Sequence, residues 1–438
     1  MKWSFTCGDV LEVVRTLDST SFDGCLCDPP YGIEFMGKSW DHGVPSKEVW
    51  TEVLRVLKPG AFLMAYGGTR THHRLMCNIE DGGFEIRDCL MWLYGSGFPK
   101  SLDISKAIDK AYGVKREDKF EGAFERRSGP TGNKRCEKCN KWLVSGNPCK
   151  CPRPQDAAVS NEAKVWDGYG TALKPSWEPC IVAMKPTDGS FAENALKHGI
   201  AGLNIDAGRI EGIPPSVPQP TFNSPTGKIY GFKFGEGRNG EMSQATGRWP
   251  ANLILDEEVG EMLDEQSGEL SSGALKHYKE KHTNASSYKM NRDKNYIKDI
   301  DYGGASRFFY CAKVDNEERE AGIMGIKHLY GQSGGAQQAI RDGDEKYLQE
   351  NIGLNRIKTV RNPHPTLKPK DLNRYLAKLI LPPEGNRKIL CPYSGAGSEV
   401  IGALLAGWDE AVGIDKEQSY IDIAEQRCRR WLPELFAW

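Results

Sequence analysis

Residues 387–415 read RKILCPYSGAGSEVIGALLAGWDEAVGID, and this stretch decides the fold class. An apolar strand-like run leads into a glycine turn, an apolar helix, and a second strand that ends at Asp415. This order is typical of a nucleoside-binding unit, because the glycines let the backbone approach the ligand and the acid binds both ribose hydroxyls. Val400 stands where a dinucleotide fingerprint has its third glycine, which favours another adenosine-bearing cofactor over nicotinamide. A generic doubly wound domain is the alternative interpretation of this half.

A second motif lies near the N-terminus, where Asp28, Pro29, Pro30 and Tyr31 follow the apolar run 22–27. It supplies a carboxylate, a rigid turn and an aromatic ring, which are the groups needed to hold a planar base with an exocyclic amine. The ring stacks on the base, while the Asp28 carboxylate and the Pro29 carbonyl accept the two amine hydrogens. This arrangement directs the nitrogen lone pair at an electrophilic methyl group. A plain loop is the alternative for the motif taken alone.

Taken together, the two motifs resemble those of DNA amino-methyltransferases that use S-adenosylmethionine, in the permuted order called the β class. In that order the catalytic tetrapeptide comes first and the cofactor glycines come last. The resemblance covers residues 1–110, 165–190 and 360–430. The matching stretches are 8–11, 28–31, 54–66, 83–94, 364–369 and 393–397. The chain departs from the family at Cys391, where an acid is more usual, and at Cys180, where an aliphatic residue is more usual.

The resemblance implies direct methyl transfer from S-adenosylmethionine to the N6 amine of an adenine that is flipped out of DNA. Cytosine N4 methylation uses the same geometry and stays an alternative, and an RNA or protein substrate also stays open. A third interpretation, from another class, is a non-catalytic zinc-containing protein that binds nucleic acid. The sequence does not give the recognition site or say whether a restriction partner exists.

The same resemblance assigns residues to the site. The catalytic set is Asp28, Pro29, Pro30 and Tyr31. Either Trp92 or Tyr94 forms the other wall of the base pocket, unless that ring is simply a core aromatic. Asp415 is expected at the ribose, Asp9 at the adenine amine, the glycine turn against the methionine part, and Thr366 with Lys368 near the methionine carboxylate. The full set expected to bind the cofactor is Asp9, Thr366, Lys368, Tyr393, Ser394, Gly395, Gly397 and Asp415.

The expected fold is α/β, with one doubly wound, mostly parallel Rossmann-like sheet assembled from both ends of the chain. Residues 1–114 supply the catalytic half and 356–438 the cofactor-binding half, while 161–189 return to the core. Two other regions interrupt the sheet. They are a basic four-cysteine insertion at 115–160 and a target-recognition region at 190–355, in which 204–210 and 248–256 are strand-like pieces.

The insertion combines positive charge with paired cysteines. Residues 100–153 contain 14 Lys or Arg against 7 Asp or Glu, which predicts a surface that contacts phosphates, with a solvated loop as the alternative. The spacing of two Cys pairs predicts a zinc knuckle with four thiolate ligands, because a small insertion has little core of its own. The predicted ligands are Cys136, Cys139, Cys149 and Cys151. Basic and aromatic residues also alternate over 276–298, which suits a nucleic-acid surface or a disordered loop.

Composition predicts a soluble, cytoplasmic enzyme, and the uneven middle region suggests a prokaryotic or viral origin. The formal net charge is −1, so any DNA-binding surface must be local. No apolar run reaches eighteen residues and the N-terminus has no signal-peptide pattern, so no membrane contact is expected. The 13 cysteines are scattered, several of them within apolar strands, which favours reduced thiols over a disulfide framework. A homodimer is considered as the assembly state.

Overall fold

The structure is a computed structural model. It describes residues 1–33, 43–95, 97, 101–114, 116, 158–212, 247–272, 301–312, 318, 323, 347, 362 and 367–432, with the backbone of six further short strands. These are β5 (Lys134–Arg135), β6 (Trp142–Leu143), β8 (Lys228–Ile229), β9 (Phe232–Lys233), β14 (His328–Gly331) and β15 (Ile357–Val360). The chain divides into two compact units, one of Met1–Gly95 with Trp177–Trp438 and the other of Ser96–Ser176.

The first unit is built on a nine-stranded sheet in the order β1-β17-β16-β2-β3-β7-β4-β10-β13. All neighbours are parallel except β7, which is antiparallel to both β3 and β4. The predicted α/β fold with a mostly parallel sheet is therefore confirmed. The strands are β1 (Lys2–Cys7), β2 (Phe22–Cys27), β3 (Leu57–Tyr66), β4 (Glu85–Leu93), β7 (Trp177–Met184), β10 (Leu253–Asp256), β13 (Tyr310–Ala312), β16 (Lys388–Pro392) and β17 (Glu410–Asp415).

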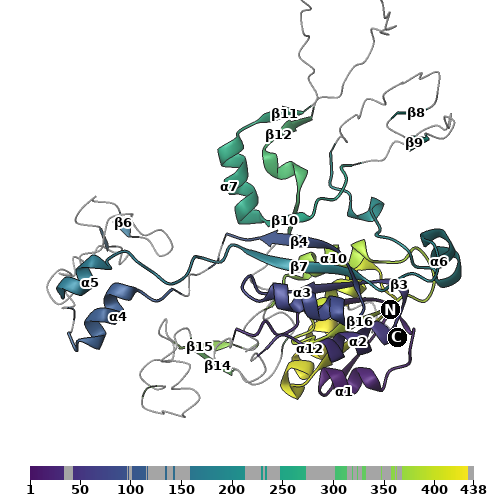
Figure 1. The fold of residues 1–438 in the computed structure, drawn as a ribbon, viewed down its shortest axis with the longest axis horizontal. Coiled ribbons are helices and arrows are strands. Elements are labelled where there is room, and N and C mark those ends of the chain that lie inside the picture. Colours follow the sequence, from purple (N-terminus) through teal and green to yellow (C-terminus); the bar gives the residue numbers. More distant parts are fainter. Residues whose placement is uncertain are drawn as a thin grey trace, which may run out of the picture. The chain divides into compact units, whose positions relative to one another are not determined.

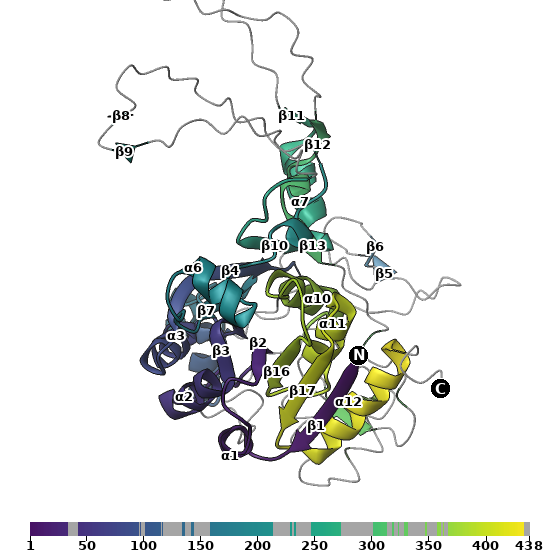
Figure 2. The same cartoon turned by 90° about the vertical axis from the view of Figure 1, so that its right-hand side faces the viewer.

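The two ends of the chain interleave in this sheet, as Figure 2 shows for β1, β17, β16 and β2. The N-terminal β1 pairs with β17, and β16 pairs with β2, in parallel register throughout. Neither half of the chain forms this sheet alone, as the sequence predicts.

Helices cover both faces of the sheet, because side chains along its strands alternate between two buried clusters (Figures 1 and 2). Leu26 and Ile389 face one cluster, while Cys25 and Leu390 face the other. The first face packs against α10 (Lys370–Leu379), α11 (Ser398–Ala406) and α12 (Gln418–Trp431). The second packs against α1 (Val10–Arg15), α2 (Lys47–Val56) and α3 (His72–Asp81).

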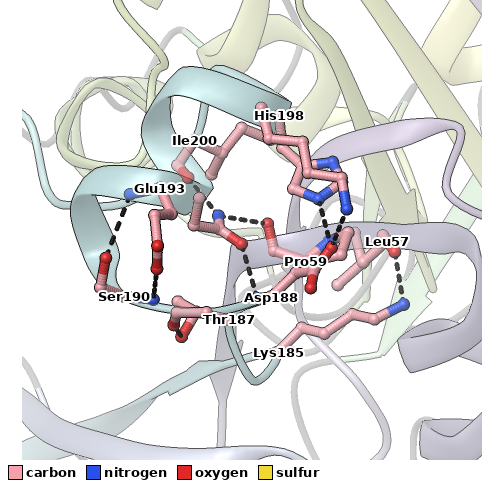
Figure 3. Close-up of polar contacts among 12 residues, drawn as sticks. Leu57, Pro59, Lys185, Thr187, Asp188, Ser190, Glu193, His198 and Ile200 are labelled. Carbon is pink, nitrogen blue, oxygen red and sulfur yellow. Dashed lines mark hydrogen bonds and ion pairs between the residues drawn. The ribbon is translucent and has the colours of Figure 1, made fainter.

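A buried polar network fixes the segment after β7 against the start of β3, and Figure 3 shows part of it. The Lys185 ammonium donates to the Leu57 carbonyl at 2.7 Å. Asn194, which is fully buried on α6 (Phe191–His198), donates to the carbonyls of Pro59 and Ile200 and accepts from the Asp188 amide. Asn194 thus joins backbone groups of three separate stretches of chain, which specifies one path for this connection.

The second unit contains α4 (Ile104–Ala111) and α5 (Asn161–Val165). Its buried Asp109 accepts hydrogen bonds from Arg116 and from the amides of Val159 and Ser160. Burial opposes ionisation, but the hydrogen bonds from Ser160, Val159 and Arg116 outweigh it and lower the pKa of Asp109. This carboxylate therefore joins the two ends of the segment that carries the cysteine motif.

The region expected to recognise the target differs from the sequence prediction in part. Residues 204–210 are not a strand: they contain the 3-10 helix η4 (Asp206–Gly208), and Ile210 forms only an isolated bridge with Arg248. The strand expected at 248–256 is present as β10, but it belongs to the main sheet beside β4. Residues 276–298 lie outside the described residues, and so does their predicted basic and aromatic surface.

The remaining elements of the region are short. They are α7 (Glu257–Ser267), η5 (Ala305–Phe308) and the antiparallel pair β11 (Leu270–Ser272) and β12 (Asp301–Gly303). Within the described ranges, no helix combines the length and the apolar composition needed to cross a bilayer.

Candidate active site

The two sequence motifs lie at the same edge of the sheet. β2 and β16 are parallel neighbours, with Ile389 beside Gly24 and Leu390 beside Cys25. The Asp28–Tyr31 turn follows β2, and the turn that contains Gly395 and Gly397 follows β16. Because ligands of open α/β sheets bind beyond the carboxyl ends of the strands, this is where a site is expected.

The turn after β16 has a backbone that glycine favours. Gly395 and Gly397 both have positive φ, at 46° and 81°, and Tyr393 has a φ of 61°. A Cβ on Gly397 would lie 2.9 Å from the Cβ of Ala424 on α12, so this position has no room for a side chain. Strain at a bulky residue such as Tyr393 is typical of functional sites.

Asp415 and Asp9 hold two neighbouring loops at this edge. The Asp415 carboxylate accepts from the amides of Gly395 and Glu417, both at 2.9 Å. Burial nevertheless raises its pKa, because desolvation outweighs these hydrogen bonds. Asp9 caps α1 by accepting from the Leu11 amide at 2.9 Å. Parallel pairing of β1 with β17 brings Cys7, two residues before Asp9, beside Asp415.

Ser394 has an unused hydroxyl group in the glycine turn. Its side chain is buried, and its Oγ has no hydrogen-bond partner among the described residues. A buried hydroxyl without a partner costs free energy, so it marks a position where a ligand group is expected to donate or accept.

The Asp28 turn forms a compact hydrogen-bonded cluster. The Tyr31 hydroxyl donates to Asp28 Oδ1 at 2.8 Å. The Lys368 ammonium lies 2.8 Å from Asp28 Oδ2, 2.9 Å from the Tyr31 hydroxyl and 3.1 Å from Glu178 Oε2. Lys368 is only 4% exposed, so this is a buried ion cluster rather than a surface pair.

The two carboxylates beside Lys368 determine the protonation states of Lys368 and Tyr31. Burial acts to lower the pKa of Lys368, but Asp28 and Glu178 outweigh it, so the net shift is upward and the ammonium stays charged. Burial, followed by the same two carboxylates, raises the pKa of Tyr31 well above its ordinary value, so the phenol stays neutral.

Aromatic rings surround the cluster. The Lys368 ammonium lies 4.9 Å from the ring centre of Tyr66 and 5.3 Å from that of Tyr31. The rings of Trp92 and Tyr94 are 5.2 Å apart, and Trp92 is 9% exposed within the core. Burial, followed by the charge of Glu178, raises the pKa of Tyr94 to about 12. Trp92 lies opposite Glu178 in the pairing of β4 with β7, so both rings of this pair are candidates for the wall of the site.

The structure brings most of the predicted residues together but distributes them differently. Asp28 and Tyr31 share a hydrogen bond. The second turn contains Tyr393, Ser394 and Gly395, and Asp415 accepts a hydrogen bond from the Gly395 amide. Lys368 contacts the Asp28 turn, whereas sequence reasoning placed it near the cofactor carboxylate. Thr366 lies outside the described residues.

Two acids of the site were missed from the sequence. Glu178 is the second residue of β7, opposite Trp92 on β4, and Glu399 is a buried acid in the first turn of α11. In both cases a single acid lies near the start of an otherwise apolar strand or helix. That sequence pattern could have indicated a buried, functional acid.

The predicted zinc ligands, Cys136, Cys139, Cys149 and Cys151, all lie outside the described residues. The first two fall in sequence between β5 and β6, which pair antiparallel. Among the residues that the structure does describe, no group of three His, Cys, Asp or Glu side chains is placed to hold a metal ion.

The chain is similar to several known proteins. The Type II methyltransferase M.HindIII of Haemophilus influenzae is 23% identical over 242 residues, which cover 45% of this chain and 63% of that protein. The chain thus spans less than two-thirds of that relative's length. Among solved structures, the M1.HpyAVI–SAM complex has 10% identity and a TM-score of 0.35, over 97% of this chain and 99% of that one. The cytosine-N4-specific PvuII DNA methyltransferase has 10% identity and a TM-score of 0.38, over 98% and 86%.

A family model described as DNA methylase, N6_N4_Mtase, matches residues 22–426. The match begins at β2, which leads into the Asp28 turn, and it ends within α12, which packs under the glycine turn. It therefore includes every strand of the main sheet except β1, and both turns of the candidate site. The chain belongs to this DNA methylase family.

Proposed function

We propose that this protein transfers the methyl group of S-adenosylmethionine to the exocyclic N6 amine of adenine in DNA. The observation that carries the proposal is the placement of the Asp28–Tyr31 turn and the glycine turn beyond the carboxyl ends of two adjacent strands. Membership of the DNA methylase family and the likeness to a Type II methyltransferase support the chemistry and the DNA substrate.

The residues of the glycine turn fit an adenosine-bearing cofactor with a methionine tail. Gly397 leaves no room for a side chain, Asp415 places a carboxylate at the end of β17, and the Ser394 hydroxyl is free to pair. Asp415 would hold the ribose, Asp9 the adenine amine, and Gly395 with Gly397 the methionine part. When bound, the cofactor supplies a methyl group activated by its sulfonium.

The Asp28 turn has the acceptors that a target amine needs. Each carboxylate oxygen of Asp28 already accepts one hydrogen bond, and each retains a second lone pair. Pro29 is a buried residue, and its carbonyl accepts no hydrogen bond within the described part of the chain. One amine hydrogen is then accepted by Asp28 and the other by Pro29, which leaves the nitrogen lone pair directed at the methyl group.

Tyr31 is proposed to stack on the flipped base. Flipping costs a few kcal/mol, and stacking on an aromatic ring returns about 1–3 kcal/mol. The hydroxyl of Tyr31 is fixed by Asp28 and Lys368, so the ring is held in position before the base arrives. A Cβ on Gly68 would lie 3.2 Å from Tyr31, so this glycine gives the ring its space.

The test is methylation by an Asp28→Ala variant on unmodified DNA. We expect cofactor affinity to be retained while methyl transfer is lost, and near wild-type transfer would overturn the catalytic assignment. Mass spectrometry of nucleosides from DNA treated with wild-type protein identifies the base. N6-methyladenine supports the proposal, and N4-methylcytosine would instead establish the alternative, for which the same two acceptors serve.

Two parts of the proposal concern regions beyond the site. We propose that the basic 115–160 insertion contacts DNA phosphates and is held together by zinc on its four cysteines. Base readout is assigned to residues 190–355, between the catalytic and cofactor-binding halves.

A further inference from the structure

Glu399 is a buried acid without a cationic partner. It lies in the first turn of α11, two residues after Gly397, and is 4% exposed. Its carboxylate accepts one side-chain hydrogen bond, from Asn373 Nδ2 at 3.4 Å. Within the described residues it forms no ion pair. An ionised carboxylate in such a place is unstable unless a cation joins it.

The cations nearest to Glu399 are already engaged. Lys368 contacts the carboxylates of Asp28 and Glu178. The guanidinium of Arg427 donates to the Ala396 carbonyl at 2.5 Å and forms a buried pair with Glu318 at 3.2 Å.

The electrostatic balance at Glu399 is therefore unfavourable. Burial, and then the negative charge of Asp28, raise its pKa to about 7, although a hydrogen bond from its own backbone amide, and then Lys368 and Arg427, act in the opposite direction. Around it also stand the phenol of Tyr66 on β3 and the thiol of Cys391 on β16, both of which remain neutral because burial raises their pKa values.

Glu399 also lies between the two functional turns. Asn373, its donor, accepts from the Tyr66 hydroxyl at 2.8 Å, and the Tyr66 ring carries the Lys368 ammonium of the catalytic cluster. On the other side, the unpartnered hydroxyl of Ser394 belongs to the same turn that leads into α11. Among the described residues, the acid at this turn thus has no cation beside it and the buried hydroxyl has no hydrogen-bond partner.

We propose that the Glu399 carboxylate binds the α-ammonium of the methionine part of the cofactor. This inference rests on the proposed use of S-adenosylmethionine. The strand end at Cys391 offers a thiol rather than a carboxylate, so in this chain the anionic contact comes from the helix that follows the glycine turn. Ammonium binding supplies the cation that the buried acid lacks. It also places the cofactor's cationic tail beside the Asn373 and Tyr66 side chains that connect Glu399 to the Lys368 cluster.

Three ligands separate the charges of the cofactor in a calorimetric binding experiment. S-adenosylmethionine has a sulfonium and an ammonium, S-adenosylhomocysteine has the ammonium alone, and 5′-methylthioadenosine has neither. For Glu399→Gln we expect at least about tenfold weaker binding of the first two ligands and unchanged binding of the third. The matched control is Glu425→Gln, at an α12 acid that pairs with Arg429 on the surface, and it should leave all three affinities unchanged.

A second measurement uses the wild-type protein alone. Affinity for S-adenosylhomocysteine should rise from about pH 6 to about pH 7, as Glu399 ionises below the range in which an α-amino group loses its proton. This rise should be absent from Glu399→Gln, whose folding is checked by its unfolding transition.

The outcomes distinguish the inference from the proposed function. If wild-type protein binds none of the nucleosides, the proposed function fails. If wild-type protein binds S-adenosylmethionine and folded Glu399→Gln binds it equally well, the inference alone fails. Equal weakening for 5′-methylthioadenosine would also overturn it, because that ligand carries no ammonium.

Discussion

The Lys368 ammonium lies 2.8 Å from the Asp28 carboxylate, although 340 positions separate the two residues in the chain. The contact joins the segment before α10 to the turn after β2. Glu178 of β7 forms a second ion pair with the same ammonium. The buried Lys368 ammonium pairs with the Asp28 carboxylate and fixes the Tyr31 hydroxyl. The geometry of the base acceptors therefore depends on a residue outside the Asp28 motif.

Replacing Lys368 by Met should lower the rate of methyl transfer by about a hundredfold, because Asp28 and Tyr31 lose the group that positions them. Cofactor affinity measured by calorimetry should change little. Lys197→Met, at an exposed lysine on α6, is the control for loss of a charge. A large loss of cofactor affinity with a preserved rate at saturation would instead place Lys368 at the methionine carboxylate.

Asp415→Ala should weaken cofactor binding by at least about tenfold, since a charged hydrogen-bond acceptor to the ribose is removed. DNA affinity measured without cofactor should stay the same. Asp422→Ala, at an exposed position on α12, provides the comparison. Unchanged calorimetric affinity of the Asp415 variant would remove this residue from the cofactor site.

Glu399→Gln should stabilise the protein in the absence of cofactor at alkaline pH. The pKa of this carboxyl is raised from 4.5 to about 7 in the folded state, so the folded protein holds the proton more tightly than the unfolded chain. The free energy of unfolding of wild-type protein therefore falls as pH rises above the unfolded value, and the full penalty, about 3 kcal/mol, is present above about pH 7.

The measurement is denaturant unfolding of both proteins at about pH 5 and about pH 8. The difference between variant and wild type should be small at the lower pH and should favour the variant at the higher pH. A variant less stable than wild type at the higher pH would show that Glu399 is ionised and paired in the folded protein.

Asn194→Ala should lower the free energy of unfolding by about 3 kcal/mol, because it removes a buried side chain that bonds the buried Ile200 carbonyl, the half-buried Pro59 carbonyl and the Asp188 amide. Lys197→Ala, which loses only an exposed ion pair with Asp188 on the same helix, should cost less than about 1 kcal/mol. Urea unfolding of the two variants checks the difference. Equal costs would mean that the network shown in Figure 3 contributes nothing specific.

The purified protein should contain about one zinc ion per chain by elemental analysis. Cys139→Ser should lose it, whereas Cys77→Ser, at an exposed free cysteine on α3, should retain it. Absence of metal, together with alkylation of all four predicted ligands in the native protein, would remove the zinc knuckle.

The sequence predicts the parts of this site whose signals are local. The glycine turn with Asp415 and the Asp28 turn are each encoded within a short stretch, and parallel pairing of their strands brings them to one edge. Residues 204–210 show the limit of such reasoning. Their sequence predicts a strand, but they contain η4 and form only an isolated bridge.

The contacts between distant elements were not predictable in the same way. Glu178 reaches Lys368 because β7 lies antiparallel between β3 and β4. No local sequence pattern predicts this strand order. Glu399 resembles an ordinary acid in the first turn of a helix until the packing of α10 against α11 buries it. Position in the assembled sheet, rather than residue type, gives both acids their surroundings.

The interleaving of β1 with β17 and of β16 with β2 has a consequence for biosynthesis. Until β16 and β17 have been synthesised, β1 has no neighbouring strand and β2 has β3 alone beside it. The sheet can therefore be completed only after residues 388–415 have left the ribosome. Separately expressed fragments, cut within 213–246, would have to find each other and reassemble to regain the central strands.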